Sequence, residues 1–307
     1  MRTCQQLALA ISGAVAVAVA ACADDGGGRQ RAPTAVAPAI RITGSDTMVN
    51  LVQAFAESYR MVRPDVSIQV AGGGSGVGIA GLIESILEIA AAGRAMTAEE
   101  RDVARARHGT APREFVVALD ALAVYVHPSN PLRQFYLDEL AEIYGEGGTI
   151  VRWSQLGIAN PRCPSDKIVR LGRQNSSGTY AYFREAVLGP GRDYKLGSID
   201  QNGSRDVVTL LSRTPCAVGY SGMAFAFEGV RAVAIAASRQ SAAVPPIAAT
   251  ARDGSYVLAR PLYFYTPAEP AGPTQAFIEW VRSAAGQEIV TRLGFVGVAP
   301  AMPADGR

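Results

Sequence analysis

The sequence predicts an α/β protein of two lobes, each built on a mainly parallel sheet flanked by helices, with a ligand in the hinged cleft between the lobes. Short apolar stretches typical of strands alternate with stretches of helical period, which is the pattern of parallel α/β sheets. Two long apolar runs, at 114–126 and 256–266, are suited to carry the chain into a second lobe and back. A chain of 307 residues is long enough for two lobes.

Composition is that of an ordinary globular protein. The chain is 49% hydrophobic and 18% charged, close to the average for globular domains. Its formal net charge is +2 and it has no block of basic residues, so nothing in the charge pattern indicates nucleic-acid binding.

The N-terminus predicts export and a lipid anchor. Arg2 precedes an uncharged apolar run of 15 residues, 7–21, which is too short for a comfortable membrane span. The run ends in Val19-Ala20-Ala21-Cys22, which resembles a bacterial lipobox. We therefore expect a signal peptide over 1–21, lipidation of Cys22, and a flexible Gly-, Ala- and Pro-rich tether over 22–38. A plain signal peptide cleaved nearby is the alternative.

The cysteines agree with an oxidising compartment. Cys4 leaves with the signal peptide and Cys22 is lipidated, so Cys163 and Cys216 remain as an even pair. A bond between them would close a loop of about 54 residues, which the loop-entropy model values at roughly 4 kcal/mol. Two free buried thiols are the alternative.

The first predicted lobe takes residues 39–123 and 259–300. Its strands are expected at 39–43, 66–70 and 88–92, and segments of helical period follow the first two, at 50–60 and 79–90. At the end of the chain, residues 275–294 show a continuous helical period that stops at a glycine.

The second predicted lobe takes residues 124–258. Helices are expected at 137–145, from Thr179 to Leu188 and at 207–214, and strands at 168–172, 216–222 and 232–237. The first of these strands ends at the loop that carries the chain's clearest functional signal.

Three loops share one pattern, a strand, then a Gly-Ser/Thr loop, then a helix. They are GSDTMV (44–49), GGGSGVG (72–78) and RQNSSGTY (173–180). Free backbone N–H groups and the helix dipole at such helix starts favour an anion, and hydroxyls and the Arg173 guanidinium add donors. One such loop could be only a capped helix. Three loops at the carboxyl ends of strands predict a common anion site.

At this point the residues match a known family. The chain resembles the phosphate-binding proteins of Pst-type ABC importers, which have the type II periplasmic binding fold, from Ile42 to about Val298. The stretches that carry the resemblance are GSDTM (44–48), GGGSG (72–76), RQNSSGTY (173–180), TPCAVGYSG (214–222), GSYVLARPLYFYT (254–266) and AGQEIV (285–290).

The resemblance implies a set of phosphate contacts and a set of supporting residues. The contacts are Thr47, the Met48 N–H, Ser75, Arg94, Arg173, Ser177, Gly178 and Thr179. The supporting residues are Ser45, Asp46, Asp120 and Asn175, the last at the position where members hold the arginine with an acidic or amide side chain. The segment 90–96 departs from the family, because Gly93 stands where members often carry serine and no aspartate is present.

Asp46 and Asp120 are candidates for a second role. A carboxylate that faced the anion would accept a phosphate proton and would repel fully deprotonated sulfate. As alternatives, Asp46 could cap a helix and Asp120 could be a hinge residue bonded to backbone.

The resemblance further implies that the protein captures inorganic phosphate and delivers it to an ABC permease with its own ATPase. We expect a periplasmic or cell-surface monomer with no cofactor and no metal, which touches the membrane through its lipid anchor only. A binding protein for another tetrahedral oxyanion, and a phosphate sensor or adhesin with no transport role, are the alternatives.

The sequence supports two enzyme classes less well than it supports a binding protein. GVGIAG (76–81) fits the dinucleotide fingerprint, but a complete βα unit precedes it and the other two loops would be unexplained. A hydrolase would need a base or metal ligands, and the two histidines, His108 and His127, lie beside no serine-rich loop. The sequence therefore predicts a binding protein rather than an enzyme.

Overall fold

The computed structural model describes residues 39–298, which form a ten-stranded mixed sheet flanked by helices. The main path of the sheet runs β2-β1-β3-β10-β4-β8-β6-β7, and β9 pairs with β4 and β5. The predicted signal peptide, the lipidation site Cys22 and the tether lie outside the described residues. Among the helices that are described, none is both long and apolar enough to cross a membrane.

The first lobe has the predicted βαβαβ order. Its elements are β1 (Ala39–Gly44), α1 (Val49–Val62), β2 (Ser67–Ala71), α2 (Ser75–Ile83), β3 (Ile89–Ala92), α3 (Ala98–His108), α8 (Gly272–Val281) and α9 (Ala284–Arg292). Strand β1 lies between β2 and β3 and is parallel to both. All three strands therefore end at the same edge, next to the first two glycine loops.

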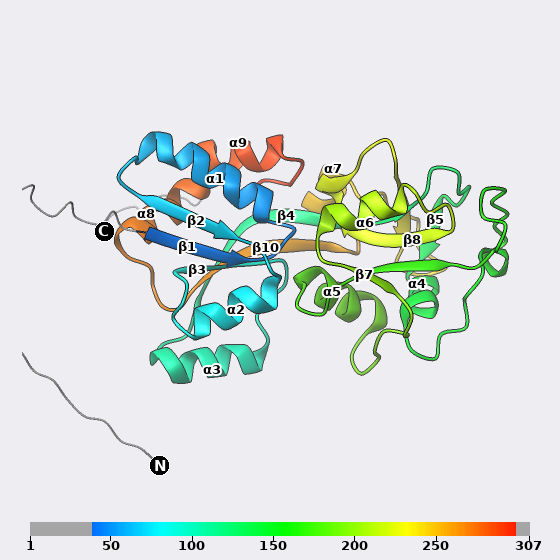
Figure 1. Cartoon of the computed structure of the whole chain (residues 1–307), viewed down its shortest axis with the longest axis horizontal. Helices are drawn as coiled ribbons and strands as arrows, with labels where there is room; N and C mark the ends of the chain where they lie inside the picture. Colours follow the sequence, from blue (N-terminus) through cyan, green and yellow to red (C-terminus); the bar gives the residue numbers. More distant parts are fainter. Residues whose placement is uncertain (1–38, 299–307) are drawn as a thin grey trace, which may run out of the picture. The chain divides into compact units, whose positions relative to one another are not determined.

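Two long strands connect the lobes, as predicted. They are β4 (Arg113–Val126) and β10 (Ala259–Thr266), which run antiparallel to each other between the two groups of helices in Figure 1. Strand β10 also pairs antiparallel with β3, and the end of β4 pairs antiparallel with β8 and β9. The sheet is thus parallel within each lobe's centre and antiparallel at the crossing.

The second lobe contains the rest of the described chain. Its elements are β5 (Gln134–Tyr136), α4 (Leu137–Tyr144), η1 (Trp153–Leu156), β6 (Val169–Arg173), α5 (Gly178–Phe183), η2 (Arg184–Leu188), β7 (Ile199–Gln201), α6 (Ser204–Leu211), β8 (Ala217–Gly222), η3 (Met223–Phe225), β9 (Arg231–Ala236) and α7 (Ala248–Arg252). Strand β6 is parallel to both β7 and β8.

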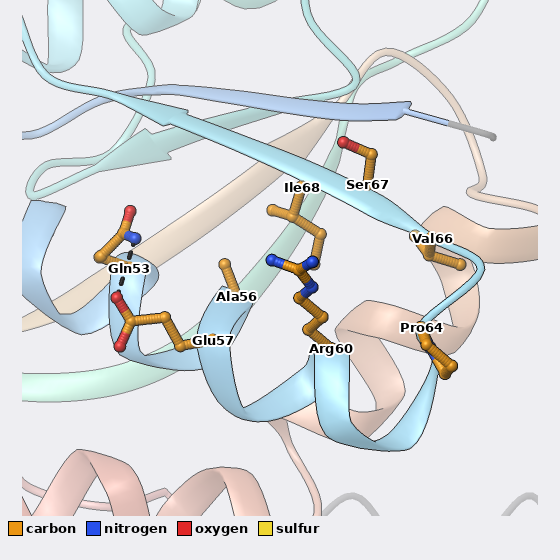
Figure 2. A pocket seen from close by; sticks show the side chains of 8 residues that line it. All are labelled: Gln53, Ala56, Glu57, Arg60, Pro64, Val66, Ser67 and Ile68. Carbon is orange, nitrogen blue, oxygen red and sulfur yellow. Dashed lines mark hydrogen bonds between the residues drawn. The ribbon is translucent and has the colours of Figure 1, made fainter. Parts of the chain in front are cut away.

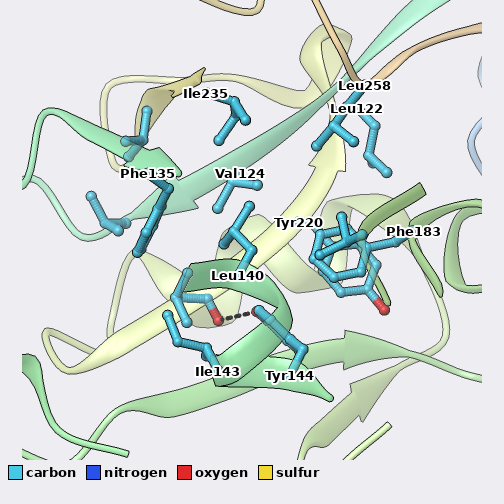
Figure 3. Packing of buried hydrophobic residues seen from close by; sticks show 14 of the residues in the cluster. Leu122, Val124, Phe135, Leu140, Ile143, Tyr144, Phe183, Tyr220, Ile235 and Leu258 are labelled. Atoms are coloured by element: carbon cyan, nitrogen blue, oxygen red, sulfur yellow. Dashed lines mark hydrogen bonds between the residues drawn. The ribbon is translucent and has the colours of Figure 1, made fainter. Parts of the chain in front are cut away.

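Each lobe has its own buried apolar cluster. In the first lobe, Phe55 and Phe277 belong to a cluster between α1, α8 and the sheet. In the second lobe, the cluster includes Tyr144, Phe183 and Tyr220 (Figure 3). The rings of Phe183 and Tyr220 stack with centroids 4.0 Å apart, which fixes α5 against the sheet. The helix that follows the third glycine loop is therefore packed against the sheet.

Two predicted helices differ from the structure. The segment expected at 79–90 begins earlier, because α2 starts at Ser75 inside the glycine loop and ends at Ile83. The continuous helix expected at 275–294 is two helices, α8 and α9. The break allows close packing at the start of α9, where a Cβ at Gly286 would lie 2.2 Å from the Val281 carbonyl oxygen.

The structure confirms the predicted disulfide. Cys163 and Cys216 are bonded, with Cα atoms 5.0 Å apart. The bond ties the loop that precedes β6 to the residue that precedes β8, at the end of the second lobe's sheet opposite the third glycine loop.

Candidate functional site

The three glycine loops meet at the junction of the lobes. The loop after β2 contacts the loop after β6 through backbone, since Gly76 N donates to Ser176 O at 3.0 Å. Ser176 Oγ donates to Gly73 O at 3.1 Å. Gly74 allows this approach, because it has a φ of 98° and an added Cβ would lie 2.5 Å from Ser176 O.

A chain of buried side chains passes through the point where the loops meet. We call it the hydroxyl row, and its members in order are Arg173, Ser204, Thr47, Thr179 and Arg260. Arg173 Nη1 donates to Ser204 Oγ at 2.7 Å, and Arg260 Nη2 donates to Thr179 Oγ1 at 3.1 Å. Between them, Thr47 Oγ1 lies 3.0 Å from both Ser204 Oγ and Thr179 Oγ1. The row therefore joins residues of both lobes.

The row has one hydrogen more than its internal contacts use. A guanidinium can only donate, whereas a hydroxyl offers one hydrogen and accepts as well. Each arginine brings one N–H and each of the three hydroxyls brings one O–H, which is one hydrogen more than the four contacts can use. A site with a spare hydrogen and two guanidinium groups is suited to an oxyanion.

A carboxylate holds the arginine at each end of the row. Arg173 Nη2 donates to Asp46 Oδ2 at 3.0 Å, and Arg260 Nη2 donates to Asp120 Oδ2 at 3.0 Å. Asp46 also accepts from Gly73 N, and Asp120 from Met223 N. These carboxylates therefore orient the two guanidinium groups.

Burial governs the protonation of these groups. Removal from water lowers the pKa of Arg173, while Asp46 acts in the opposite direction and the like charge of Arg260 lowers the pKa further. Burial raises the pKa of the Asp120 carboxyl, although the Arg260 guanidinium opposes the rise.

Ser75 and Gly178 bring the second and third loops into close contact. Ser75, with 0% relative exposure, accepts a bond from Gly93 N at 3.0 Å through its Oγ, which leaves its own hydrogen to donate. An added Cβ at Gly178 would lie 2.2 Å from Ser75 Oγ. Only glycine at 178 lets the start of α5 approach this hydroxyl, as the loop pattern predicts.

Most of the predicted site residues lie together. Thr47, Arg173 and Thr179 are members of the hydroxyl row, and Ser75 and Gly178 lie next to it. Ser177 is the N-cap of α5, and its Oγ accepts hydrogen bonds from the backbone N–H groups of Thr179 and Tyr180.

Four other predicted residues have different surroundings. Arg94 forms a two-pronged ion pair with Glu100, at 2.7 and 2.6 Å. The Met48 N–H donates to the backbone carbonyl of Ser45. Ser45, another of the predicted residues, is buried. Asn175 is exposed, and Arg173 is held by Asp46 instead. All of the predicted phosphate contacts, including those from Arg94 and Met48, stay predictions.

Sequence reasoning missed two members of the row, Ser204 and Arg260. Ser204 starts α6 after a two-residue loop that follows the short strand β7, and so it repeats the strand-loop-helix pattern a fourth time. A strand of three residues is too short to be recognised from periodicity. Arg260 is a single charge in the apolar run 256–266, and that signal could have identified it.

Two of the surface hollows differ in their relation to the hydroxyl row. One, of about 320 Å³, lies between α1 and β2 (Figure 2) and has no member of the hydroxyl row in its lining. Its lining consists of Gln53, Ala56, Glu57, Arg60, Pro64, Val66, Ser67 and Ile68. The other, of about 270 Å³, borders Arg260 on the side where the Tyr182 ring covers the guanidinium. Arg94 lies in the wall of the second hollow.

Comparison with known proteins shows which family the chain belongs to. Residues 29–285 match the family model of the PBP superfamily domain. The phosphate-binding protein PstS of Pseudomonas aeruginosa is 33% identical over 264 residues, which cover 82% of this chain and 81% of that protein. The phosphate-binding protein PstS of Bacillus subtilis is 31% identical over 263 residues, covering 84% and 80%.

A solved structure is similar over the same range. It is a putative phosphate ABC transporter substrate-binding protein from Clostridium perfringens with bound phosphate, with a TM-score of 0.74 and 27% identity, covering 85% of this chain and 99% of the other. The resemblance predicted from the sequence is confirmed, and the chain belongs to the PstS family of phosphate-binding proteins, within the PBP superfamily.

Proposed function

We propose that this chain binds inorganic phosphate in the cleft between its lobes and delivers it to the permease of an ABC importer. The observation that carries the proposal is the hydroxyl row, with its two guanidinium groups and its one spare hydrogen. Serine and threonine hydroxyls can also accept, so they tolerate phosphate with one or two protons. The relatives named as phosphate-binding proteins support the same ligand.

The protein acts as a binding protein and not as an enzyme. Catalysis of hydrolysis would need a base beside a nucleophile. His108 Nε2 contacts Leu82 O, and His127 Nδ1 contacts Ser129, so neither ring contacts the hydroxyl row. Energy for transport would come from the ATPase of the importer.

The two lobes would close on the anion by a hinge motion at the crossing strands. We place the lobe boundaries near 123/124 and 258/259, within or beside the crossing strands β4 and β10. Thr47 and Ser75 belong to the first lobe and Arg173, Ser177 and Thr179 to the second. If both sets contact one anion, phosphate stabilises the closed arrangement, because only there are all the donors used.

The protein would work outside the cytoplasm, held at a membrane by a lipid on Cys22. The disulfide supports an oxidising compartment. Mass analysis of the mature N-terminus tests the anchor, and a chain that still carries residues 1–21 would contradict it.

Calorimetric titration of the full chain with phosphate, sulfate and arsenate tests the ligand. We expect phosphate to bind, and sulfate to bind at least about tenfold more weakly because it brings no proton for the hydroxyls to accept. Equal affinity for sulfate would indicate a general oxyanion-binding protein, and no binding of any of the three would refute the proposed function.

A further inference from the structure

Arg260 is a charged residue in the crossing strand β10, and its side chain is almost completely buried. Its relative exposure is 1%, and Asp120, which pairs with its Nε and Nη2, is at 0%. A buried ion pair is often no more stabilising than apolar side chains of similar volume. The pair therefore calls for an explanation other than the stability of the strand.

The guanidinium faces the hydroxyl row. Besides Asp120, Arg260 donates from Nη2 to Thr179 Oγ1 at 3.1 Å and from Nη1 to Gly93 O at 3.1 Å. Together with the two bonds to Asp120, these contacts use four of the five N–H donors of an arginine. One N–H of Nη1 has no acceptor within residues 39–298.

The loop after β3 lies directly beside this guanidinium. An added Cβ at position 93 would lie 3.4 Å from Arg260 Nη1, an ordinary contact distance, and 3.2 Å from Ser45 Oγ. Arg260 is therefore in contact with this loop through both Gly93 O and the space beside Gly93 Cα.

We propose that Arg260 is a second arginine of the phosphate site, positioned by Asp120, and that it donates to a phosphate oxygen from the side opposite Arg173. This inference rests on the proposed function. An oxyanion that replaced the contacts between hydroxyls in the row would meet one guanidinium at each end. The two like charges repel each other, and an anion between them would relieve the repulsion.

Removal of the whole ion pair tests the proposal without leaving a buried charge. In an Arg260→Gln/Asp120→Asn variant that stays folded, we expect the Kd for phosphate to rise at least about 30-fold, which corresponds to about 2 kcal/mol. The matched control is Arg41→Gln/Glu88→Gln, because Arg41 also donates to one carboxylate through Nε and Nη2. The control should bind within about threefold of the parent.

A second variant separates contact with phosphate from support of the fold. Arg260→Lys keeps a positive charge beside Asp120 but lacks the planar fork. We expect it to keep the melting temperature of the parent and to lose at least about tenfold in phosphate affinity. Affinity within threefold of the parent in either folded variant would overturn the proposal. Failure of the parent itself to bind phosphate would instead refute the proposed function.

Discussion

At the scale of single residues, Arg173 has the most demanding position in the site. It has 0% relative exposure, and its bonds go to Asp46 in the first lobe, to Ser204, and to the carbonyls of Gln201 and Asn202. A buried charge needs such partners, because each unpaired hydrogen would cost free energy. The same contacts fix the direction in which the guanidinium points.

Substitution of Arg173 should therefore weaken phosphate binding most. We expect Arg173→Ala to cost about 2–5 kcal/mol, or roughly 30-fold to several-thousand-fold in Kd. Ser177→Ala should cost less, about 1–3 kcal/mol, part of it through loss of the α5 cap. Calorimetry on both folded variants gives the order. An Arg173→Ala protein that binds as tightly as the parent would place the site elsewhere.

How much of the site could be predicted depends on the length of the local pattern. Thr47, Ser75 and Thr179 follow from loops that stand between a recognisable strand and helix. Ser204 follows a strand of three residues, and Arg260 reaches the row across the sheet rather than along the chain. Contacts of this second kind depend on strand order, which a single sequence does not give.

At the scale of elements, helix starts and stops were the least predictable features. The glycines before α2 suggested a loop up to residue 78, but Ser75 is already helical. Between α8 and α9, Gly286 allows a packing contact that the apolar period of 275–294 does not reveal. Tertiary packing decided both boundaries, since the local preferences on either side are weak.

The disulfide belongs to this scale, because it ties a loop to a strand. We expect a Cys163→Ser/Cys216→Ser variant to lose about 2–5 kcal/mol in free energy of unfolding, measured with urea. Ser165→Ala is the control, since Ser165 Oγ lies 3.5 Å from Cys216 Sγ and is not part of the bond. A double variant as stable as the parent would contradict the prediction. Two reactive thiols in the denatured, unreduced mature protein, in which we expect Cys4 to be absent and Cys22 to be lipidated, would contradict it as well.

At the scale of the whole molecule, the two crossing strands organise the fold. Strand β4 pairs with β10 along 113–121 and with β8 along 122–126, so one strand belongs to both lobes. Its apolar run at 114–126, broken by Asp120, predicted that the chain crosses into the second lobe here. The antiparallel pairing could not be predicted, because strands buried on both faces have the same apolar pattern in either direction.

The two ion pairs at the ends of the hydroxyl row determine how phosphate affinity should depend on ionic strength. Each guanidinium charge is matched by a carboxylate, Arg173 by Asp46 and Arg260 by Asp120, so the pairs carry no net charge. A phosphate ion would then be held by short hydrogen bonds in a buried site, where salt screens little. We expect the Kd to change less than about threefold between 20 mM and 500 mM sodium chloride, two concentrations chosen to span roughly the range of Debye lengths from 20 to 4 Å. A tenfold weakening in calorimetry would show that long-range attraction dominates. With little dependence on salt, the protein would capture phosphate about equally well in fresh and in brackish surroundings.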